Sequence, residues 1–420
     1  MRYNSAMTFA AVICEFNPLH NGHAYLLAKA KKRTGCDALV CVMSGNFVQR
    51  AEPAVADMRT RAHAALLCGA DAVIELPALY ATACGERFSE GAINILNSIP
   101  GVTHLVFGSE SGNLEFMQKV AAIQTEESEL FKRTLKEALD KGIPYAAAYG
   151  QATGTVSGSL APKSPNDLLG IEYLKQLIKS GSAIRPVAIK RVGAGHHDTE
   201  QRDGFSSATA IRAFFESGDA SAARNAMPEA AFELFLAELC QGQAATDCSK
   251  GMQAEALEQV LRQRRACFGV LTVLALRSRE MSGCPDAGEG LEIKLKLNAL
   301  EYIDLDKIIE KTKSKRYTEA RVRRLCLQAL LGITHYPTTP QIPAKLIGVR
   351  ANLKAAILRC LPKSIIVKNK DFEKYAAALS PAESEAARYI WSVNKTAAFM
   401  FPLIKGREGD LYASQPILTV

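Results

Sequence analysis

The stretch "FAAVICEFNPLHNGH", residues 9–23, joins a short apolar run to two histidines that lie three positions apart. The apolar run is too short for a buried helix and lacks polar alternation, so it predicts a strand covered on both faces. Asn17-Pro18 then marks a turn, and a helix is expected to begin near Asn21 or Gly22. The stretch therefore predicts a strand, a loop and a helix whose first turn carries the two histidines.

Four further apolar runs, at 37–44, 71–76, 103–109 and 185–192, resemble the first one. Helical periodicity lies between or beside them, at 22–33, 58–69, 89–99, 130–142 and 166–181. Strands that alternate with helices predict an α/β fold with a doubly wound parallel sheet. Ligands bind at the carboxyl ends of the strands in such sheets, which is where the loop after residue 14 should lie.

Beyond residue 228 the strand-like runs give way to helical patterns, so we expect a mainly α-helical second domain. The predicted domains are a catalytic domain at 8–227 and a helical domain at 228–420. Residues 251–420 carry a net charge of +10 and residues 1–250 a net charge of −2, which together give the +8 of the chain. The basic half indicates either a polyanion partner such as RNA or a solvated basic surface.

The composition, with 48% hydrophobic and 22% charged residues, is that of a globular protein. No apolar run is long enough for a membrane span, and the N-terminus lacks the order of a secretory signal. The 11 cysteines are scattered without zinc-ligand spacing. We therefore expect a cytoplasmic protein with reduced thiols, no membrane contact and no metal-binding motif.

The two histidines point to phosphate chemistry. Backbone N–H groups at a helix N-terminus attract phosphate, and Gly22 lets a ligand approach the backbone closely. Imidazoles of His20 and His23 can donate to a triphosphate and stabilise the charge that builds as pyrophosphate leaves. A second helix start, "SSATAIR" at 206–212, offers Ser206 or Ser207 as a cap, and its free N–H groups and Arg212 can bind the β and γ phosphates. Ser207, Thr209 and Arg212 are therefore further candidates for ATP binding.

These two motifs resemble the nucleotidyltransferase superfamily that carries His-x-Gly-His after its first strand and Ser-Ser-Thr-x-Ile-Arg later in the domain. Further stretches are "VMSGNFVQRAEPA" at 42–54, "SPNDLLGIEYL" at 164–174, "IKRVGAGHHD" at 189–198, and, in the C-terminal part, "GLEIKLKLNAL" and "KRYTEARVRRL". In this order they are similar to the tRNA(Met) cytidine acetate ligase family, over most of residues 8–335. The family's "QRGEPA" has glycine where this chain has Ala51, which is tolerable unless that position needs a positive φ.

The resemblance implies an enzyme that activates acetate with ATP as acetyl-adenylate. The acetyl group would then pass to the wobble cytidine of elongator tRNA(Met) and give N4-acetylcytidine. The implied ATP-binding residues are Ile13, Cys14, Glu15, Phe16, Asn17, Pro18, Leu19, His20, Asn21, Gly22, His23, Ala24, Tyr25, Leu26, Gly108, Asn166 and Arg191. Mg²⁺ is expected on the phosphates, held mainly by the nucleotide.

Two alternatives stay open at this point. An adenylyltransferase that joins a nucleotide to a phosphorylated metabolite would use the same phosphate motifs, but it leaves the basic C-terminal part without a role. A non-catalytic RNA-binding protein could keep the fold, although intact His20, Gly22 and His23 speak against it.

The sequence marks the residues that would bind acetate and RNA less clearly than those that would bind ATP. A small carboxylate needs a few donors in a tight pocket, and we expect Ser44, Gly45, Asn46 and Gln49 to supply them, unless they form an ordered loop beneath the nucleotide. The RNA-binding candidates are Lys311, Lys313, Lys315, Arg316, Arg321, Arg323 and Arg324, around Tyr317 as a stacking platform. A solvated helix face is the alternative for that segment. His196 and His197 are candidate general bases, and the oligomeric state is left open.

Overall fold

A seven-strand path of hydrogen-bonded strands forms the centre of the molecule, in the order β10-β8-β5-β2-β1-β6-β7. The bounds are β1 Phe9–Cys14, β2 Ala38–Ser44, β5 Ala72–Leu76, β6 Val102–Ser109, β7 Arg185–Lys190, β8 Ala344–Val349 and β10 Leu418–Thr419. Within this path, β5, β2, β1, β6 and β7 run parallel to one another. These five are the predicted strands, so the predicted doubly wound α/β fold is confirmed.

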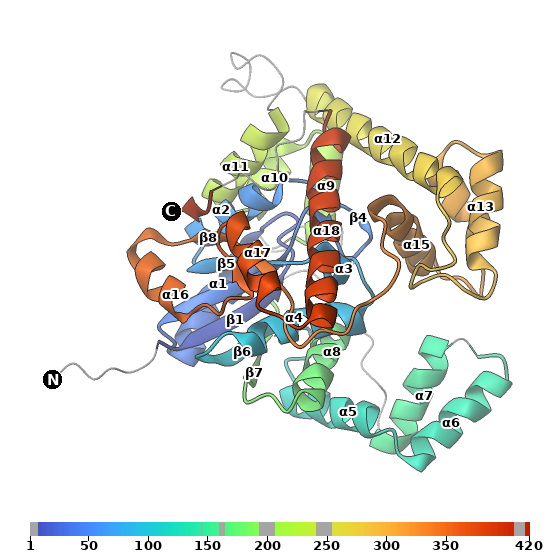
Figure 1. The fold of residues 1–420 in the computed structure, drawn as a ribbon, viewed down its shortest axis with the longest axis horizontal. Coiled ribbons are helices and arrows are strands. Elements are labelled where there is room, and N and C mark those ends of the chain that lie inside the picture. The colour runs from blue at the N-terminus through green and yellow to red at the C-terminus, as the bar shows by residue number, and fades with distance from the viewer. Residues whose placement is uncertain (1–6, 144, 159–163, 193–205, 241–253, 407–415) are drawn as a thin grey trace.

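The chain is described by a computed structural model over residues 7–143, 145–158, 164–192, 206–240, 254–406 and 416–420 (Figure 1). His196 and His197 lie outside the described residues. Among the residues that are described, no helix has the length and apolar character needed to cross a membrane.

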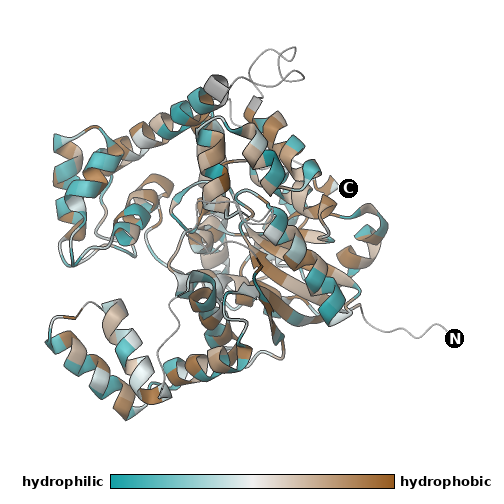
Figure 2. Ribbon diagram, turned by 180° about the vertical axis from the view of Figure 1, so that it is seen from behind, coloured by the Kyte–Doolittle hydropathy of each residue, from teal (hydrophilic) through white to brown (hydrophobic). Residues whose placement is uncertain are grey.

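Helices cover both faces of the sheet because the central strands are apolar on both faces. The helices up to residue 240 are α1 Asn21–Thr34, α2 Met58–Leu67, α3 Ala78–Ala81, α4 Gly85–Ser98, α5 Leu114–Glu126, α6 Glu129–Asp140, α7 Tyr145–Ser157, α8 Pro165–Lys179, α9 Ala208–Glu216, α10 Ala220–Ala226 and α11 Glu229–Cys240. One core cluster packs α4, α5 and α8 against one face, and a second packs α1, α2, α9 and α11 against the other. Figure 2 shows the apolar strands inside this shell of helices. A two-stranded hairpin, β3 Phe47–Val48 and β4 Glu52–Pro53, follows β2.

The chain after α11 divides into two parts. The helices α12 Ala254–Ser278, α13 Leu291–Glu301, α14 Leu305–Thr312 and α15 Glu319–Leu331 form a lobe with its own core cluster. The rest comprises β8, the short 3₁₀ helix Ala351–Leu353, α16 Lys354–Cys360, β9 Ile365–Ile366, α17 Asn369–Ala377, α18 Pro381–Ile404 and β10. This second part returns to the sheet beside β5 (Figure 1).

The expectation that strands end before residue 228 is therefore wrong. All six residues of β8 are buried, and the strand pairs with β5 in antiparallel fashion. Helix α18 contributes Ile390 and Phe401 to one core cluster and Trp391 to the other. Residues 228–420 are mainly helical, as predicted, but their last part completes the core of the sheet. The boundary at 227/228 stays a prediction.

Candidate active site

The paired histidines hold the loop after β1 through the backbone of α1. His20 is the N-cap residue, and its Nδ1 accepts a hydrogen bond from the N–H of Gly22 at 3.1 Å. Nδ1 of His23 lies 3.4 Å from the backbone nitrogen of His20 and completes a reciprocal capping box. Because Nδ1 of His20 is an acceptor, the neutral ring carries its proton on Nε2 and can donate it to a ligand.

Both imidazoles are neutral near pH 7. Burial, with the nearby Arg191 guanidinium as a second cause, lowers the pKa of His20 to about 3. Burial also lowers the pKa of His23, reinforced by His20 and Arg191 and opposed by the carbonyl of Pro18. Neutral imidazoles act on phosphate as hydrogen-bond donors, without the repulsion that two adjacent cations would create.

A cavity of about 370 Å³ opens at the carboxyl ends of β1, β6 and β7, between α1 and α9. Of the predicted ATP residues, it is lined by Ile13, Cys14, Glu15, Phe16, Asn17, His20, Gly22, His23, Tyr25, Leu26, Gly108, Asn166, Arg191, Ser207, Thr209 and Arg212. Pro18, Leu19, Asn21 and Ala24 are not among the lining residues. Leu19 packs in the core, and the Asn21 amide donates to the carbonyl of Asn225 instead.

The N-terminus of α9 forms the wall opposite α1, as the "SSATAIR" motif predicts. Ser207 caps the helix by accepting from the N–H of Ala210 at 3.1 Å. The hydroxyl of Ser206 is buried and has no hydrogen-bond partner among the described residues, although Ser206 lines the cavity. A buried polar atom of this kind fits a polar ligand such as a phosphate. The structure thus brings the two predicted phosphate motifs to one cavity.

Arginine side chains also line the cavity near the N-terminus of α9. Arg212 donates to the carbonyl of Asn17 at 2.9 Å, and its second nitrogen lies 3.4 Å from the hydroxyl of Thr209. Arg50 also reaches that hydroxyl, at 3.2 Å. Sequence reasoning missed Arg50 as a phosphate contact, although it stands directly after Gln49 in the "VMSGNFVQRAEPA" stretch. Three guanidinium groups, of Arg50, Arg191 and Arg212, therefore line one cavity with two helix N-termini, which suits a polyanion such as a triphosphate.

Gly108 and Asn166 form the far side of the cavity, near β6 and α8. The Asn166 amide donates to Glu110, while the Asp167 carboxylate accepts from the N–H groups of Glu110 at 3.1 Å and Ser111 at 3.2 Å. These bonds tie the start of α8 to the end of β6. A Cβ built on Gly108 would meet nothing closer than Arg191 Cγ at 3.5 Å, so the protein itself leaves room at this position.

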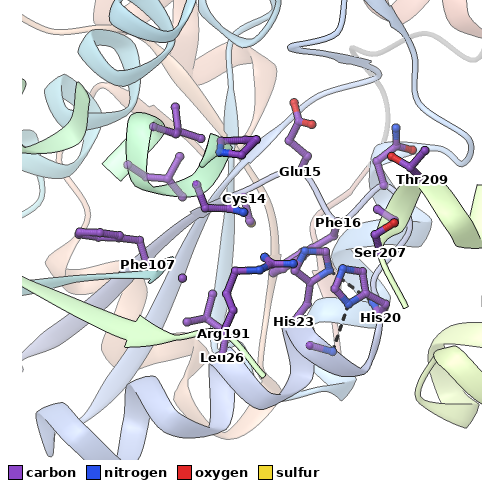
Figure 3. A pocket seen from close by; sticks show the side chains of 18 of the residues that line it. Cys14, Glu15, Phe16, His20, His23, Leu26, Phe107, Arg191, Ser207 and Thr209 are labelled. Carbon is purple, nitrogen blue, oxygen red and sulfur yellow. Dashed lines mark hydrogen bonds between the residues drawn. The ribbon is translucent and has the colours of Figure 1, made fainter. Parts of the chain in front are cut away.

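Glu15 and Arg61 connect the ends of β1 and β2. Glu15 Oε1 accepts from the N–H of Gln49 at 2.7 Å and from the hydroxyl of Ser44 at 3.3 Å. Arg61, which has no exposed surface, donates to the carbonyls of Ala56, Glu15, Ser44 and Gly45. Figure 3 shows Glu15 and Cys14 on one side of the site and His20 with His23 on the other.

The comparisons with known proteins agree with this geometry. A family model described as HIGH Nucleotidyl Transferase matches residues 7–396. The tRNA(Met) cytidine acetate ligase of Caldanaerobacter subterraneus subsp. tengcongensis is 39% identical over 332 residues, 78% of this chain and 79% of that protein. The same-named protein of Clostridium novyi is 35% identical over 336 residues, 79% of this chain and 80% of the relative. This chain belongs to the tRNA(Met) cytidine acetate ligase family.

A solved structure of a relative extends the likeness to the whole fold. The Thermotoga maritima protein TmcAL, bound with alpha-thio ATP, superposes with a TM-score of 0.84 at 28% identity, and the match covers 98% of this chain and all of that one. Its apo form gives a TM-score of 0.85 at 29% identity over 99% of this chain. Within the family, an ATP analogue is thus bound by a protein of the same fold.

Three of the four residues expected to bind acetate are not among the residues that line the cavity. Among Ser44, Gly45, Asn46 and Gln49, only Gln49 lines it. The hydroxyl of Ser44 donates to Glu15, and the amide oxygen of Asn46 accepts from the N–H of Met58 at 2.8 Å. These hydrogen bonds are the kind that the ordered-loop alternative expects, and the acetate role of the four residues stays a prediction. Phe88, Phe107 and Tyr173, which the sequence did not single out, line the cavity instead.

The basic segment of the ligase's helical lobe is largely engaged within the lobe. Tyr317 is 9% exposed and its hydroxyl donates to the carbonyl of Glu289, so the structure places it in the core rather than on a stacking surface. All four arginines among the predicted RNA contacts form ion pairs: Arg316 and Arg321 with Glu289, Arg323 with Asp306 and Glu319, and Arg324 with Asp286.

Lysines remain exposed along the same segment. Lys313 lies 3.5 Å from Glu319, whereas Lys311 and Lys315 have no ion pair with any described residue. Of the predicted set, these two side chains are therefore the freest to meet a phosphate backbone.

The described part of the ligase contains no cluster of three or more histidine, cysteine, aspartate or glutamate side chains that could hold a metal ion. The donor set of the cavity fits a nucleotide, through arginines, helix N-termini and the Ser206 hydroxyl.

Proposed function

We propose that the protein is an ATP-dependent ligase that activates acetate as acetyl-adenylate and acetylates the wobble cytidine of elongator tRNA(Met). The observation that carries the proposal is the convergence of the His20/His23 loop and the α9 N-terminus on one arginine-lined cavity, in a chain of the tRNA(Met) cytidine acetate ligase family. A tRNA substrate implies a cytoplasmic location.

The first step joins acetate to the nucleotide. An acetate oxygen attacks the α-phosphorus, a new P–O bond forms, and pyrophosphate leaves with the electron pair of the broken bond. His20 and His23 donate hydrogen bonds to the phosphate oxygens, and Arg212 and Arg50 neutralise the charge that passes to pyrophosphate. Mg²⁺, bound through the phosphate oxygens, would add further charge neutralisation.

We place acetate at the end of the cavity that Gln49 lines. The Gln49 side chain supplies a polar contact there, and Phe88, Phe107 and Tyr173 supply an apolar wall for a methyl group. A tight, partly apolar pocket with few donors is what a small carboxylate requires. The lysines Lys311 and Lys315, on the helical lobe, are proposed contacts for the tRNA backbone.

The test is acetate-dependent exchange of labelled pyrophosphate into ATP, followed by nucleoside mass spectrometry of tRNA(Met) after incubation with acetate and ATP. We expect exchange that needs acetate, and N4-acetylcytidine in the tRNA. His23→Ala should lower exchange about 10²–10³-fold through loss of a transition-state donor. His335→Ala is the matched control, because His335 is exposed and stacks on Tyr389 away from the cavity. Absence of exchange with the wild-type protein would contradict the proposal.

A further inference from the structure

Glu15 stands in the cavity without a role in the phosphate chemistry. It follows β1 directly and is the one carboxylate among the described residues that line the cavity. Its Oε1 atom accepts from Gln49 and Ser44, whereas Oε2 accepts no hydrogen bond from any described residue. A carboxylate that is held in place through one oxygen, while its other oxygen accepts no hydrogen bond from the described residues, is suited to receive a proton from a ligand.

The groups around Glu15 have opposite effects on the pKa of its carboxyl. Burial raises the pKa of this carboxyl, while the Gln49 N–H, the guanidinium groups of Arg61 and Arg212 and the Ser44 hydroxyl act in the opposite direction. Cys14 and Tyr173 also face it, and burial raises the pKa of both, so the thiol and the phenol keep their protons near pH 7.

The other titratable side chains around the cavity are poor proton acceptors. The Nδ1 atom of His20 already accepts a hydrogen bond from the backbone, and Nε2 of that ring carries the proton. The ring of His23 stacks on that of His20, and its Nδ1 atom faces the backbone N–H of His20. Lys190 and the three arginines are donors. Transfer of an acetyl group to an amine releases one proton, so a base is needed that the phosphate-binding groups do not provide.

We propose that Glu15 is the catalytic base that removes the proton from the exocyclic amine of cytidine during acetyl transfer. The inference rests on the proposed function. As the amine nitrogen attacks the acetyl carbonyl carbon, the C–N bond forms and the bond from that carbon to the phosphate oxygen breaks. AMP leaves with the electron pair, and the amine proton moves to Oε2 of Glu15.

The experiment separates the two half-reactions of the full-length enzyme. Acetyl-adenylate is formed on the enzyme from labelled acetate and ATP with pyrophosphatase present, tRNA(Met) is then added, and the single-turnover transfer rate is measured beside the exchange rate. The variants are Glu15→Gln and, as a matched control, Glu129→Gln, which changes a side chain that is 93% exposed on α6.

For E15Q we expect transfer to fall 10²–10⁴-fold, the usual contribution of a general base, and exchange to fall less than tenfold. Equal losses in both half-reactions would overturn the proposal and make Glu15 a support for the Gln49 loop. Wild-type transfer by E15Q would overturn it as well. If the wild-type enzyme shows no acetate-dependent exchange, the proposed function fails and this inference falls with it.

A second variant gives a readout that a purely structural role would not move. Ser44→Ala removes one of the two hydrogen bonds that stabilise the Glu15 carboxylate, so the pKa of Glu15 should rise. The acid limb of the transfer rate should then shift to higher pH, whereas the acid limb for E129Q should stay at the wild-type position. An unshifted acid limb in S44A, with E15Q inactive in transfer, would contradict proton acceptance by Glu15.

Discussion

The rings of His20 and His23 stack with centroids 3.6 Å apart and planes 26° from parallel. At this separation a proton on one ring disfavours a proton on the other, and burial disfavours both. The pair is therefore kept neutral, which preserves the N-cap of α1 and presents donors rather than cations to the cavity.

The stacked pair makes the fold sensitive to acid. The folded pKa of His20, about 3, lies below the ordinary value of 6.5, so the unfolded chain binds more protons between these limits. The stability that neutral His20 provides is complete above pH 6.5 and is lost as the pH falls towards 3, at up to about 1.4 kcal/mol per pH unit.

We expect His20→Asn, which keeps a good N-cap but cannot titrate, to show a shallower decline in the free energy of unfolding below pH 6.5. Urea unfolding at several pH values between 7 and 4 measures this. His335→Asn should decline as the wild type does, and identical curves for H20N and wild type would contradict a buried neutral His20.

Arg61 should be essential for stability, because it satisfies three backbone carbonyls at the ends of β1 and β2 and the carbonyl of Ala56 before α2. Arg61→Met leaves those buried acceptors without donors, at about 1–3 kcal/mol for each group that finds no substitute. A loss of more than about 3 kcal/mol in denaturant unfolding is expected. Arg59→Met, two residues earlier on α2, removes a side chain whose one hydrogen bond to a described residue goes to the carbonyl of Pro416, and it should cost less than half as much.

The site was predictable where one local motif decides the geometry. The 9–23 stretch and "SSATAIR" each encode a helix N-terminus, and the parallel sheet brings both to the carboxyl ends of its strands. Three of the four residues predicted to bind acetate are absent from the cavity lining, because sequence order does not tell which side chains of the loop after β2 face inward. The side chain of Ser44 donates a hydrogen bond to Glu15, and that of Asn46 accepts one from the N–H of Met58.

Long-range packing accounts for the other differences. Nothing local to 344–349 indicates that this segment pairs with β5, more than 260 residues earlier in the chain. Tyr317 sits in a basic, polar stretch, yet the lobe of α12–α15 folds over its ring. Ala51, which replaces a family glycine, has a φ of 58°, so this chain holds an L-residue in the left-handed region.

Substitution of Gly108 should affect nucleotide binding without affecting the stability of the fold. An added Cβ would make ordinary contact with Arg191 at 3.5 Å, so Gly108→Ala should leave the unfolding midpoint unchanged. The same methyl group would meet a nucleotide in the cavity, and overpacking of about 1–3 kcal/mol corresponds to roughly 5- to 150-fold weaker ATP binding. Calorimetry with a non-hydrolysable ATP analogue tests this. Gly150→Ala on α7 is the control, and wild-type affinity in G108A would place the nucleotide elsewhere.

The exposed lysines of the helical lobe should carry part of the RNA affinity. Because Lys311 and Lys315 have no ion pair with the described residues, their charges are available to phosphates, unlike those of Arg321 or Arg324. In filter-binding titrations against salt, the double variant Lys311→Ala/Lys315→Ala should bind tRNA more weakly and lower the log–log salt slope by about 1 per lysine. Lys132→Ala on α6, which pairs with Glu129, is the control for an unrelated charge loss. Tyr317→Phe should leave the affinity unchanged, since the ring is buried. A salt slope unaltered in the double variant would move the RNA surface away from this segment.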